Sequence, residues 1–516
     1  MNPEEALKLP ALDYMALAPM LIMFGIACVG VLIEGFVPGR LRHRIQLPLS
    51  LVAVVVALVV VVRQAGKHTL TAGGAVAADG PALFLQGSIL VLGAVSLLLI
   101  GERTLEHGGP FVAQAAVTAN TDADRSQASR REGATEVFPL ALFALGGMML
   151  FASANDLLTM FVALEVFSLP LYLMCALARR RRLLSQEAAL KYFLLGSFAS
   201  AFFLFGVALV YGFAGQVNFG AINAAIAESP HSQTLLYVGF AMLTIGLLFK
   251  VAAVPFHVWT PDVYQGAPTP VTALMAACTK VAAFGALLRV CQVAFARSAW
   301  DFTPVLGTIA VLTMIIGAVL AVTQTDIKRL LAYSSIANAG YVMVGVLAID
   351  QQGRGLSSSL FYLVAYGFTV LAAFGIVTLV RDANGEATHL SRWAGLGRRS
   401  PLYAGLFTFV LLAFAGLPLT SGFMAKFGVF AAAIEDGHTW LVIAGVISSA
   451  VLAFPYLRVV VMMWLSEPGE HTPTVSIPGA LTAAALVIGV VATLLLGVVP
   501  GRCWTSRPRR PSSSDE

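Results

Sequence analysis

Residues 246–272 read GLLFKVAAVPFHVWTPDVYQGAPTPVT, an apolar stretch interrupted by polar residues. A helix that carries Lys250 here meets Pro255, which has no backbone N–H to donate and clashes with the preceding turn. Apolar sequence continues on both sides, so the break falls inside a segment long enough to enter a membrane. Non-helical backbone at that depth is tolerated where it is buried in protein or lines a cavity. The stretch therefore predicts a membrane helix broken at a polar site.

The composition excludes a soluble globular chain. Of 516 residues, 58% are hydrophobic and 11% are charged, against about 25% charged in an average soluble domain. The net charge of +5 is spread over loops, which indicates a lipid bilayer as surroundings and no nucleic-acid partner. The five cysteines form no CxxC pair and have no histidine at ligand spacing, so neither an iron–sulfur cluster nor a structural zinc is indicated. The first apolar run is long enough to span, and a cleaved signal peptide is not expected.

Apolar segments of spanning length follow one another along most of the chain. They lie at about 15–36, 45–63, 83–100, 137–153, 156–178, 188–214, 235–257, 268–294, 303–323, 328–349, 357–380, 402–431, 440–465 and 476–500. We therefore predict an all-α integral membrane protein with about fourteen transmembrane helices.

Basic residues are concentrated in alternate loops. Arg40, Arg103, the run Arg179 to Arg182, Lys328 and Arg398 would share one side. By the positive-inside rule that side is cytoplasmic, and the N-terminus lies outside. An even number of spans leaves the arginine-rich tail after Pro500 outside as well, so either the tail tolerates this placement or the number of spans differs by one.

The order of the spans divides the chain into four regions. Residues 1–136 form a three-helix region with a cytoplasmic loop, and residues 466–516 form the last transmembrane helix and a basic tail. Residues 137–294 and 303–465 hold five spans each, and because five is odd the second set runs opposite to the first. These would be two inverted five-helix repeats.

A second break is predicted in FAGLPLTSGFMAKF, residues 414–427, where Gly416, Pro418 and Gly422 precede Lys426. With Pro255, this gives one broken helix in each repeat, a pattern that points to a transporter pathway. The alternative is that both prolines are absorbed in ordinary kinked helices.

Glu165, Lys250, Lys280 and Lys426 are ionisable residues inside four different predicted spans. Insertion of a central Lys or Asp costs roughly 2.5 to 3.5 kcal/mol. Each lysine could instead extend toward an interface or form a structural pair, but four such residues in four helices favour a functional role.

Burial penalises the charged form of an ionisable group, whereas a nearby opposite charge favours it. Moving Glu165 relative to Lys250 would therefore switch the proton affinity of the lysine, which is the elementary step of a pump. His257 suits a proton shuttle because an unperturbed histidine titrates near about pH 6.5, although a structural role is the usual one for a lone histidine. Lys191, placed in the first turn of its span, could serve as a relay or form an ion pair with Glu187 at i, i+4.

Several segments together resemble a known family. They are SANDLLTMFVALEVFSLPLYL (153–173), EAALKYFLLGSFASAFFLFG (187–206), FKVAAVPFHVWTPDVYQGAPTPVTALM (249–275), IKRLLAYSSIANAGY (327–341) and LPLTSGFMAKF (417–427). They resemble the antiporter-like subunits of complex I, the respiratory NADH:quinone oxidoreductase, and among these the members called subunit N. The resemblance covers roughly residues 137–465.

The resemblance implies a proton relay with assigned roles. Glu165 and Lys250 would form the coupled pair of the first half-channel, and Lys191 would lie near the entry. Lys280 and His257 would be the central relay, and Lys426 the exit group. Some family members carry glutamate at the last position, so its lysine separates this chain from them.

The resemblance also implies a non-redox subunit of a proton-translocating enzyme in the bacterial inner (plasma) membrane. NADH, FMN, iron–sulfur clusters and a quinone, menaquinone or ubiquinone, would belong to partner subunits, with no cofactor in this chain. Partners would be neighbouring antiporter-like and small membrane subunits and the peripheral subunits of complex I. The alternatives are a subunit of a multisubunit cation/proton antiporter or membrane-bound hydrogenase, and a passive structural scaffold.

Overall fold

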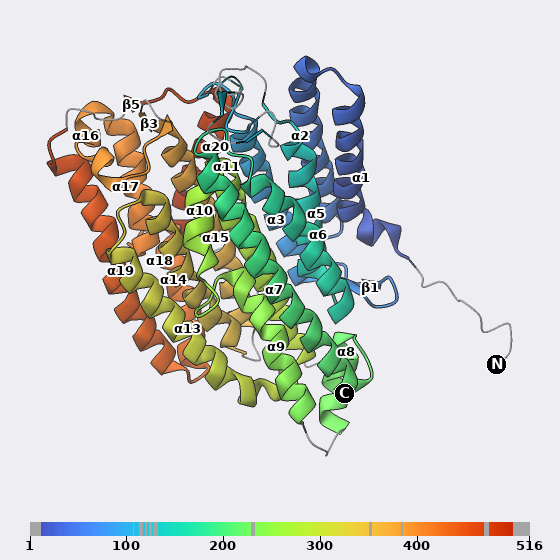
Figure 1. Ribbon diagram of the computed structural model, residues 1–516. Coiled ribbons are helices and arrows are strands. Elements are labelled where there is room, and N and C mark those ends of the chain that lie inside the picture. The colour runs from blue at the N-terminus through green and yellow to red at the C-terminus, as the bar shows by residue number, and fades with distance from the viewer. Residues whose placement is uncertain are drawn as a thin grey trace, which may run out of the picture.

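The computed structural model is a bundle of long helices that run along a common direction (Figure 1). It describes residues 12–106, 108–112, 117–118, 121–122, 126, 133–228, 233–349, 353–382, 385–468 and 474–498. The tail 502–510 and much of the loop 101–136 lie outside these residues. The all-helical membrane class is confirmed, because 12 helices of the described chain are long and apolar enough to cross a membrane.

The N-terminal region consists of α1 (Tyr14–Phe36), α2 (Gly39–Arg63), the hairpin β1 (Thr69–Thr71) and β2 (Val76–Ala78), and α3 (Gly80–Gly101). The helices that follow are α5 (Val137–Ser153), α6 (Leu157–Cys175), α7 (Arg182–Ala214), α8 (Phe219–Glu228), α9 (Thr234–Val251), α10 (Trp259–Gly266), α11 (Thr269–Leu274) and α12 (Lys280–Arg289). The π-helical turns Met275–Thr279 and Val290–Ala294 flank α12.

The second half consists of α13 (Ala299–Val322), α14 (Ile327–Leu347), α15 (Arg354–Leu379), β3 (Val380–Asp382), β4 (Gly385–Glu386), α16 (Leu396–Arg399), α17 (Pro401–Ala415), α18 (Ser421–Glu435), α19 (Thr439–Leu465), β5 (Thr474–Val475) and α20 (Ala480–Val498). Short 3-10 turns cover Ala296–Ser298 and Leu390–Trp393. α5 and α17 are apolar but shorter than the 12 candidate spans.

The two ends of the bundle differ in chemistry. At one end β3 pairs with both β4 and β5, and Arg381 pairs with Glu106 of the segment after α3. We call this the arginine-rich end, because the segments after α1, α3, α6 and α15 place their arginines there. At the other end the β1–β2 hairpin pairs with the segment after α5, through Val76 and Ala154.

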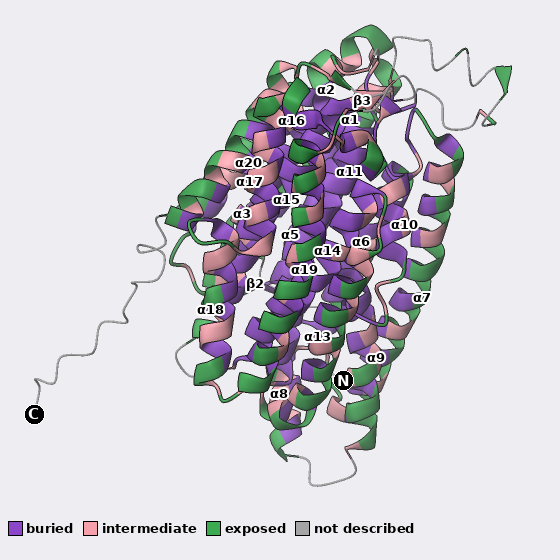
Figure 2. Cartoon of the chain, turned by 90° about the vertical axis from the view of Figure 1, so that its left-hand side faces the viewer, coloured by how far each residue is buried: buried purple, intermediate pink, exposed green. Residues whose placement is uncertain are grey.

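The core of the bundle is made by three segments. In the most apolar stretch of Thr269–Ala294 every residue is buried, and in those of α14 and α15 94% and 89% of the residues are buried. In the corresponding stretches of α1, α2, α19 and α20 the share is 33%. Figure 2 shows the same division, with buried residues inside and exposed ones on the outer helices. The outer helices expose apolar side chains such as Leu32, Val62 and Ile443, as expected of a lipid-facing surface.

Both expected helix breaks are present. α9 ends at Val251 and α10 begins at Trp259, and the backbone between them is held by a hydrogen bond from Val254 N to Thr313 Oγ1 (3.0 Å). The second break separates α17 from α18, where Gly416 and Leu419 have φ values of +84° and +68°.

One expected boundary is wrong. Lys191 was predicted to lie in the first turn of its span, but α7 begins at Arg182, so Lys191 lies in the third turn. The span was drawn from apolar residues only, whereas residues 183–187 (LLSQE) continue the helix toward the arginine-rich end. Leu, Gln and Glu are good helix formers whether or not lipid surrounds them.

Close packing of α7 on α9 depends on glycine. A Cβ at Gly206 would lie 2.4 Å from the backbone N of Leu243, so the two backbones approach as they do at small-residue membrane contacts.

We predict that Gly206→Ala destabilises the protein by about 1 to 3 kcal/mol, because backbone atoms must move. Gly212→Ala in the same helix is the control, since no atom lies within 4 Å of its Cβ. Thermal unfolding of the purified protein checks this, and equal midpoints for the two variants would contradict it.

Candidate functional site

Lys250 is buried in the last turn of α9, with 4% of its surface exposed. Its Nζ donates a hydrogen bond to Ser168 Oγ on α6 (2.7 Å). The ammonium group also lies 5.2 to 5.8 Å from the centroids of four aromatic rings, those of Phe167, Tyr172, Tyr192 and Phe249. Ring faces attract a cation without carrying a formal charge. Lys250 is therefore held by neutral groups.

Glu165 lies on the same helix as Ser168, three residues earlier, and so shares its face. In the described part of the chain no ion pair within 4 Å joins Glu165 to Lys250, so Ser168 is the direct partner of the lysine. The buried Oε1 of Glu165 and the hydroxyl of Tyr172, farther along α6, have no hydrogen-bond partner among the described residues. The sequence analysis missed Ser168 and Tyr172.

Lys280 is the first residue of α12, directly after the π-helical turn Met275–Thr279, and is 4% exposed. Its Nζ donates to the carbonyl oxygen of Ser335 on α14 and lies 5.7 Å from the ring centroid of Tyr366. The hydroxyls of Ser335 and Tyr366 are buried and make no hydrogen bond of ordinary geometry within the described residues. Single π-helical turns are frequent at functional sites.

Lys426 lies in α18, in the second turn after the second break, and is 7% exposed. Its Nζ donates to the carbonyl oxygens of Phe414 (3.0 Å) and Ala415 (3.1 Å), the last residues of α17, and to Ser449 Oγ on α19 (2.8 Å). The final carbonyls of a helix have no partner within the helix and carry its negative dipole end. The break thus supplies the oxygen atoms that hold the ammonium group.

A row of polar side chains on α14 lies between the residues that contact Lys280 and Lys426. Asn338 donates to Ser334 O (2.8 Å) and accepts from the Tyr362 hydroxyl (2.6 Å). Tyr341 bonds Ser448 Oγ (2.9 Å), and its ring lies 4.9 Å from Lys426 Nζ. The six steps from residue 335 to residue 341 rise about 9 Å along a helix.

The sequence analysis did not identify this row, although a signal was present. Ser334, Asn338 and Tyr341 are spaced i, i+4, i+7, which places them on one helix face. That face turns toward other helices, because all three residues are at most 3% exposed.

His257 lies in the break between α9 and α10 and is half-buried. α9 ends at Val251, so His257 lies beyond the helix that carries Lys250. No hydrogen bond or ion pair joins His257 to Lys250 or Lys280 within the described chain, and its Nδ1 makes no hydrogen bond of ordinary geometry there.

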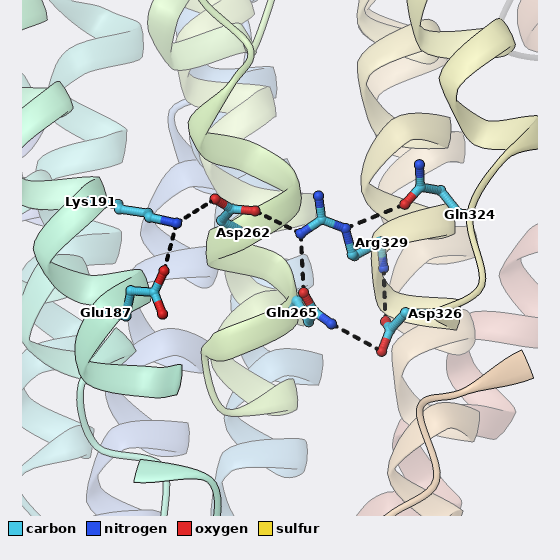
Figure 3. Close-up of polar contacts among 7 residues, drawn as sticks. All are labelled: Glu187, Lys191, Asp262, Gln265, Gln324, Asp326 and Arg329. Carbon is cyan, nitrogen blue, oxygen red and sulfur yellow. Dashed lines mark hydrogen bonds and ion pairs between the residues drawn. The ribbon is translucent and has the colours of Figure 1, made fainter. Parts of the chain in front are cut away.

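Lys191 belongs to a charged network at the first broken helix (Figure 3). Its Nζ lies 2.7 Å from Glu187 and 2.8 Å from Asp262 of α10. The other oxygen of Asp262 pairs with Arg329 of α14 (2.6 Å). One carboxylate is therefore shared by a cation from each half of the chain, an arrangement that the sequence analysis missed.

Gln265 extends this network within α10. Its amide oxygen accepts from Arg329 (3.1 Å), and its amide nitrogen donates to Asp326 (3.3 Å). Asp326 caps α14 by accepting hydrogen bonds from the backbone N–H groups of Lys328 and Arg329. The network thus fixes the start of α14 to the short helix that follows the break.

The described residues contain no group of three or more His, Cys, Asp or Glu that could hold a metal ion. The groups that the site places in contact are lysines, hydroxyls, amides and carboxylates, whose shared chemistry is proton exchange and hydrogen bonding.

Comparison with known proteins decides the family. Residues 154–452, more than half of the chain, match the family described as NADH:quinone oxidoreductase/Mrp antiporter, transmembrane. The chain belongs to this family. A Salinispora arenicola protein named NADH-quinone oxidoreductase subunit N is 71% identical over 501 residues, which are 96% of each chain. The expected resemblance to the antiporter-like subunits of complex I is confirmed.

Solved structures agree with this assignment. A chain of respiratory complex I from Thermus thermophilus is 32% identical with a TM-score of 0.75, and the match covers 94% of this chain and 97% of that one. A chain of the Mrp complex from Dietzia is 22% identical with a TM-score of 0.78, covering 93% and 94%, and shows that it shares the fold.

The shared carboxylate yields a prediction about stability. Asp262→Asn should cost about 1 to 3 kcal/mol of unfolding free energy, because it weakens hydrogen bonds to two charged partners. Glu187→Gln should cost less than about 1 kcal/mol, since the Glu187 side chain is 56% exposed against 31% for Asp262. Thermal unfolding of the purified complex measures both. An equal or larger cost for Glu187→Gln would refute the central place given to Asp262.

Proposed function

We propose that this chain is the proton-translocating subunit N of a bacterial NADH:quinone oxidoreductase, driven by quinone reduction in other subunits. The observation that carries the proposal is the surroundings of Lys250, Lys280 and Lys426. Each ammonium group is deeply buried and is held by hydroxyl or carbonyl oxygens and aromatic faces. In the described chain none of the three forms an ion pair with a carboxylate.

Neutral partners matter because a buried charge without a counter-charge is costly. A lysine held only by neutral oxygens can lose its proton without leaving an unpaired carboxylate behind. Approach of a carboxylate, such as Glu165 on the neighbouring helix, then favours the protonated form of Lys250. This is the coupling that a charge-driven pump requires.

Protons need a continuous path between these groups. The α14 row supplies hydroxyls and an amide between Lys280 and Lys426. Between Lys250 and Lys280 the ring of Tyr192 stacks on Trp259 (4.7 Å), which packs on Tyr264 (6.4 Å). Buried polar atoms without protein partners are normally satisfied by ordered water. Those beside Lys250 and Lys280 support a path completed by water.

Lys191 and His257 are assigned peripheral steps. Lys191 would take up protons near the entry, because its side chain is 42% exposed and its partner Asp262 is shared with Arg329. His257 would relay protons across the break, since it lies in non-helical backbone with a free ring nitrogen.

The proposed topology has fourteen crossings, with α5 and the broken pair α17–α18 added to the 12 long helices. Residues 137–294 and 303–465 would be inverted repeats flanked by regions 1–136 and 466–516. Two observations support this. The fourth crossing is broken in both sets, and a buried lysine contacts each break. With the arginine-rich end inside, the N-terminus lies outside.

The chain would contribute to a translocase as its non-redox membrane part. NADH, FMN, iron–sulfur clusters and a quinone would reside in partner subunits, and neighbouring antiporter-like and small membrane subunits would pack against the chain. The bacterial inner membrane would hold the whole complex.

A subunit of a cation/proton antiporter is the second candidate, because the fold of the Mrp chain is shared. The name of the relative with 71% identity favours the oxidoreductase. Purifying the native complex and measuring NADH oxidation separates these two candidates. A passive scaffold is the remaining alternative, and it predicts normal proton transport after replacement of the buried charges.

Lys250→Ala and Glu165→Ala should each reduce proton pumping by at least about tenfold, the scale of a lost acid–base group. Pumping is measured in inverted membrane vesicles by the quenching of a pH-sensitive dye on NADH addition. Lys67→Ala, in the loop before β1, is the matched control and should pump normally. Assembly is checked by the amount of complex purified. Normal pumping in both buried-site variants would refute the proposal.

Orientation can be tested independently. In a background with Cys28 and Cys503 replaced by serine, Lys67→Cys should react with a membrane-impermeant maleimide in intact cells, because it lies at the end opposite the arginine-rich one. Arg399→Cys should react only after the membrane is opened. The reverse pattern would place the N-terminus inside.

A further inference from the structure

A small polar pocket lies at the arginine-rich end, where the two halves of the chain meet. Its volume is about 60 Å³, several times the roughly 10 to 15 Å³ that one water needs. The walls come from the α6–α7 loop and the α10–α11 turn on one side, and from the start of α14 and β3–β4 on the other. A compact polyatomic anion matches this size.

Five cationic side chains line the pocket, and two carboxylates line it among the described residues. The cations are Arg179, Arg180, Arg181, Lys328 and Arg381, and the carboxylates are Glu106 and Glu386. Glu106 is already shared, because it pairs with Arg180 (3.3 Å) and with Arg381. Glu386 accepts a hydrogen bond from Thr269. The walls therefore carry an excess of positive charge.

Lys328 is the cation of the pocket that most needs a negative partner, because only 2% of its surface is exposed. Its Nζ donates to the carbonyl oxygen of Ala267 (2.8 Å), a neutral partner, although an ammonium group has three hydrogens to donate. Arg181 approaches from the opposite wall and donates to Thr388 Oγ1 (3.0 Å) and to the Glu386 carbonyl (3.1 Å), again neutral acceptors. The carboxylates of Glu386 and Asp326 act on Lys328 without a direct hydrogen bond, and an anion between Lys328 and Arg181 would give both cations a direct negative partner.

The charges that act on Arg179, which lines the pocket, also bear on anion binding. Burial lowers the pKa of Arg179, Glu106 opposes that effect and Arg180 adds to it. Arg179 and Arg180 therefore repel each other, an effect that Glu106 outweighs at Arg179 and that a bound anion would reduce further.

We propose that this pocket binds a phosphate group, supplied by the headgroup of an anionic phospholipid or by free phosphate. Arginine and lysine are the residues that recognise phosphate oxygens, and basic pockets between membrane helices on the cytoplasmic side bind anionic headgroups. Lys328 and Arg381 would hold the phosphate from the second half and Arg181 from the first.

Because the pocket lies beside the charged network of Figure 3, a bound phosphate would also affect that network. Gln265 belongs to both, and Lys328 is the chain neighbour of Arg329, the partner of Asp262. A phosphate that bridges the α6–α7 loop to α14 would therefore stabilise the contact between the two halves, where Lys191 and Arg329 both pair with the Asp262 carboxylate.

The test uses the purified complex that contains this subunit. Wild type, Arg181→Gln/Lys328→Gln and the milder Arg181→Gln are extracted in detergent, and retained anionic phospholipid is quantified by mass spectrometry. After delipidation, binding of radiolabelled inorganic phosphate is measured by equilibrium dialysis. Arg44→Gln/Arg399→Gln removes the same charge at the same end but outside the pocket and is the matched control.

Wild type and control should retain a phospholipid, or bind a phosphate, that the double variant lacks. Arg181→Gln, an exposed position, should weaken phosphate binding about tenfold, the equivalent of about 1.4 kcal/mol. A difference in retained lipid identifies the headgroup as the source, and a difference in phosphate alone identifies the free anion. Equal binding by all variants would overturn the proposal, as would an equal loss in the control.

Discussion

An ammonium group inside a bilayer costs roughly 2.5 to 3.5 kcal/mol to insert at a helix centre, and the bundle is arranged around three of them. Two of them are placed against backbone carbonyl oxygens of helices, and the third against a side-chain hydroxyl and aromatic rings. Lys426 uses the last carbonyls of α17, and Lys280 uses a carbonyl of α14. Lys250 uses the Ser168 hydroxyl and a cage of aromatic rings.

Irregular backbone follows from that requirement. The last carbonyls of an α-helix have no partner within the helix, whereas an interior carbonyl such as that of Ser335 is shared with the helix's own bond. The break after α17 is therefore part of how the charge of Lys426 is accommodated. The innermost segments, α14 and α15, shield these places from lipid. The arginine-rich end then ties the halves together through Asp262, Arg329 and the pocket beside them.

Much of the architecture could be predicted from the sequence, because span length, proline position and charge placement are local properties. Pro255 and Pro418 located both breaks, and Lys250, Lys280 and Lys426 were recognised from their depth alone. Contacts between distant helices could not be predicted in this way. Ser168 and Asp262 look ordinary within their own helices, and their importance appears only once α6 meets α9 and α10 meets α14.

The central claim is that these buried lysines belong to one hydrated proton path. An experimental structure of the assembled complex, at a resolution that reveals ordered water, tests it most directly. The account predicts water bound to Glu165 Oε1 and the Tyr172 hydroxyl, and to the hydroxyls of Ser335 and Tyr366. These waters would connect Lys250 through Lys280 to the α14 row. A dry, closely packed interior between Lys250 and Lys280 would contradict it.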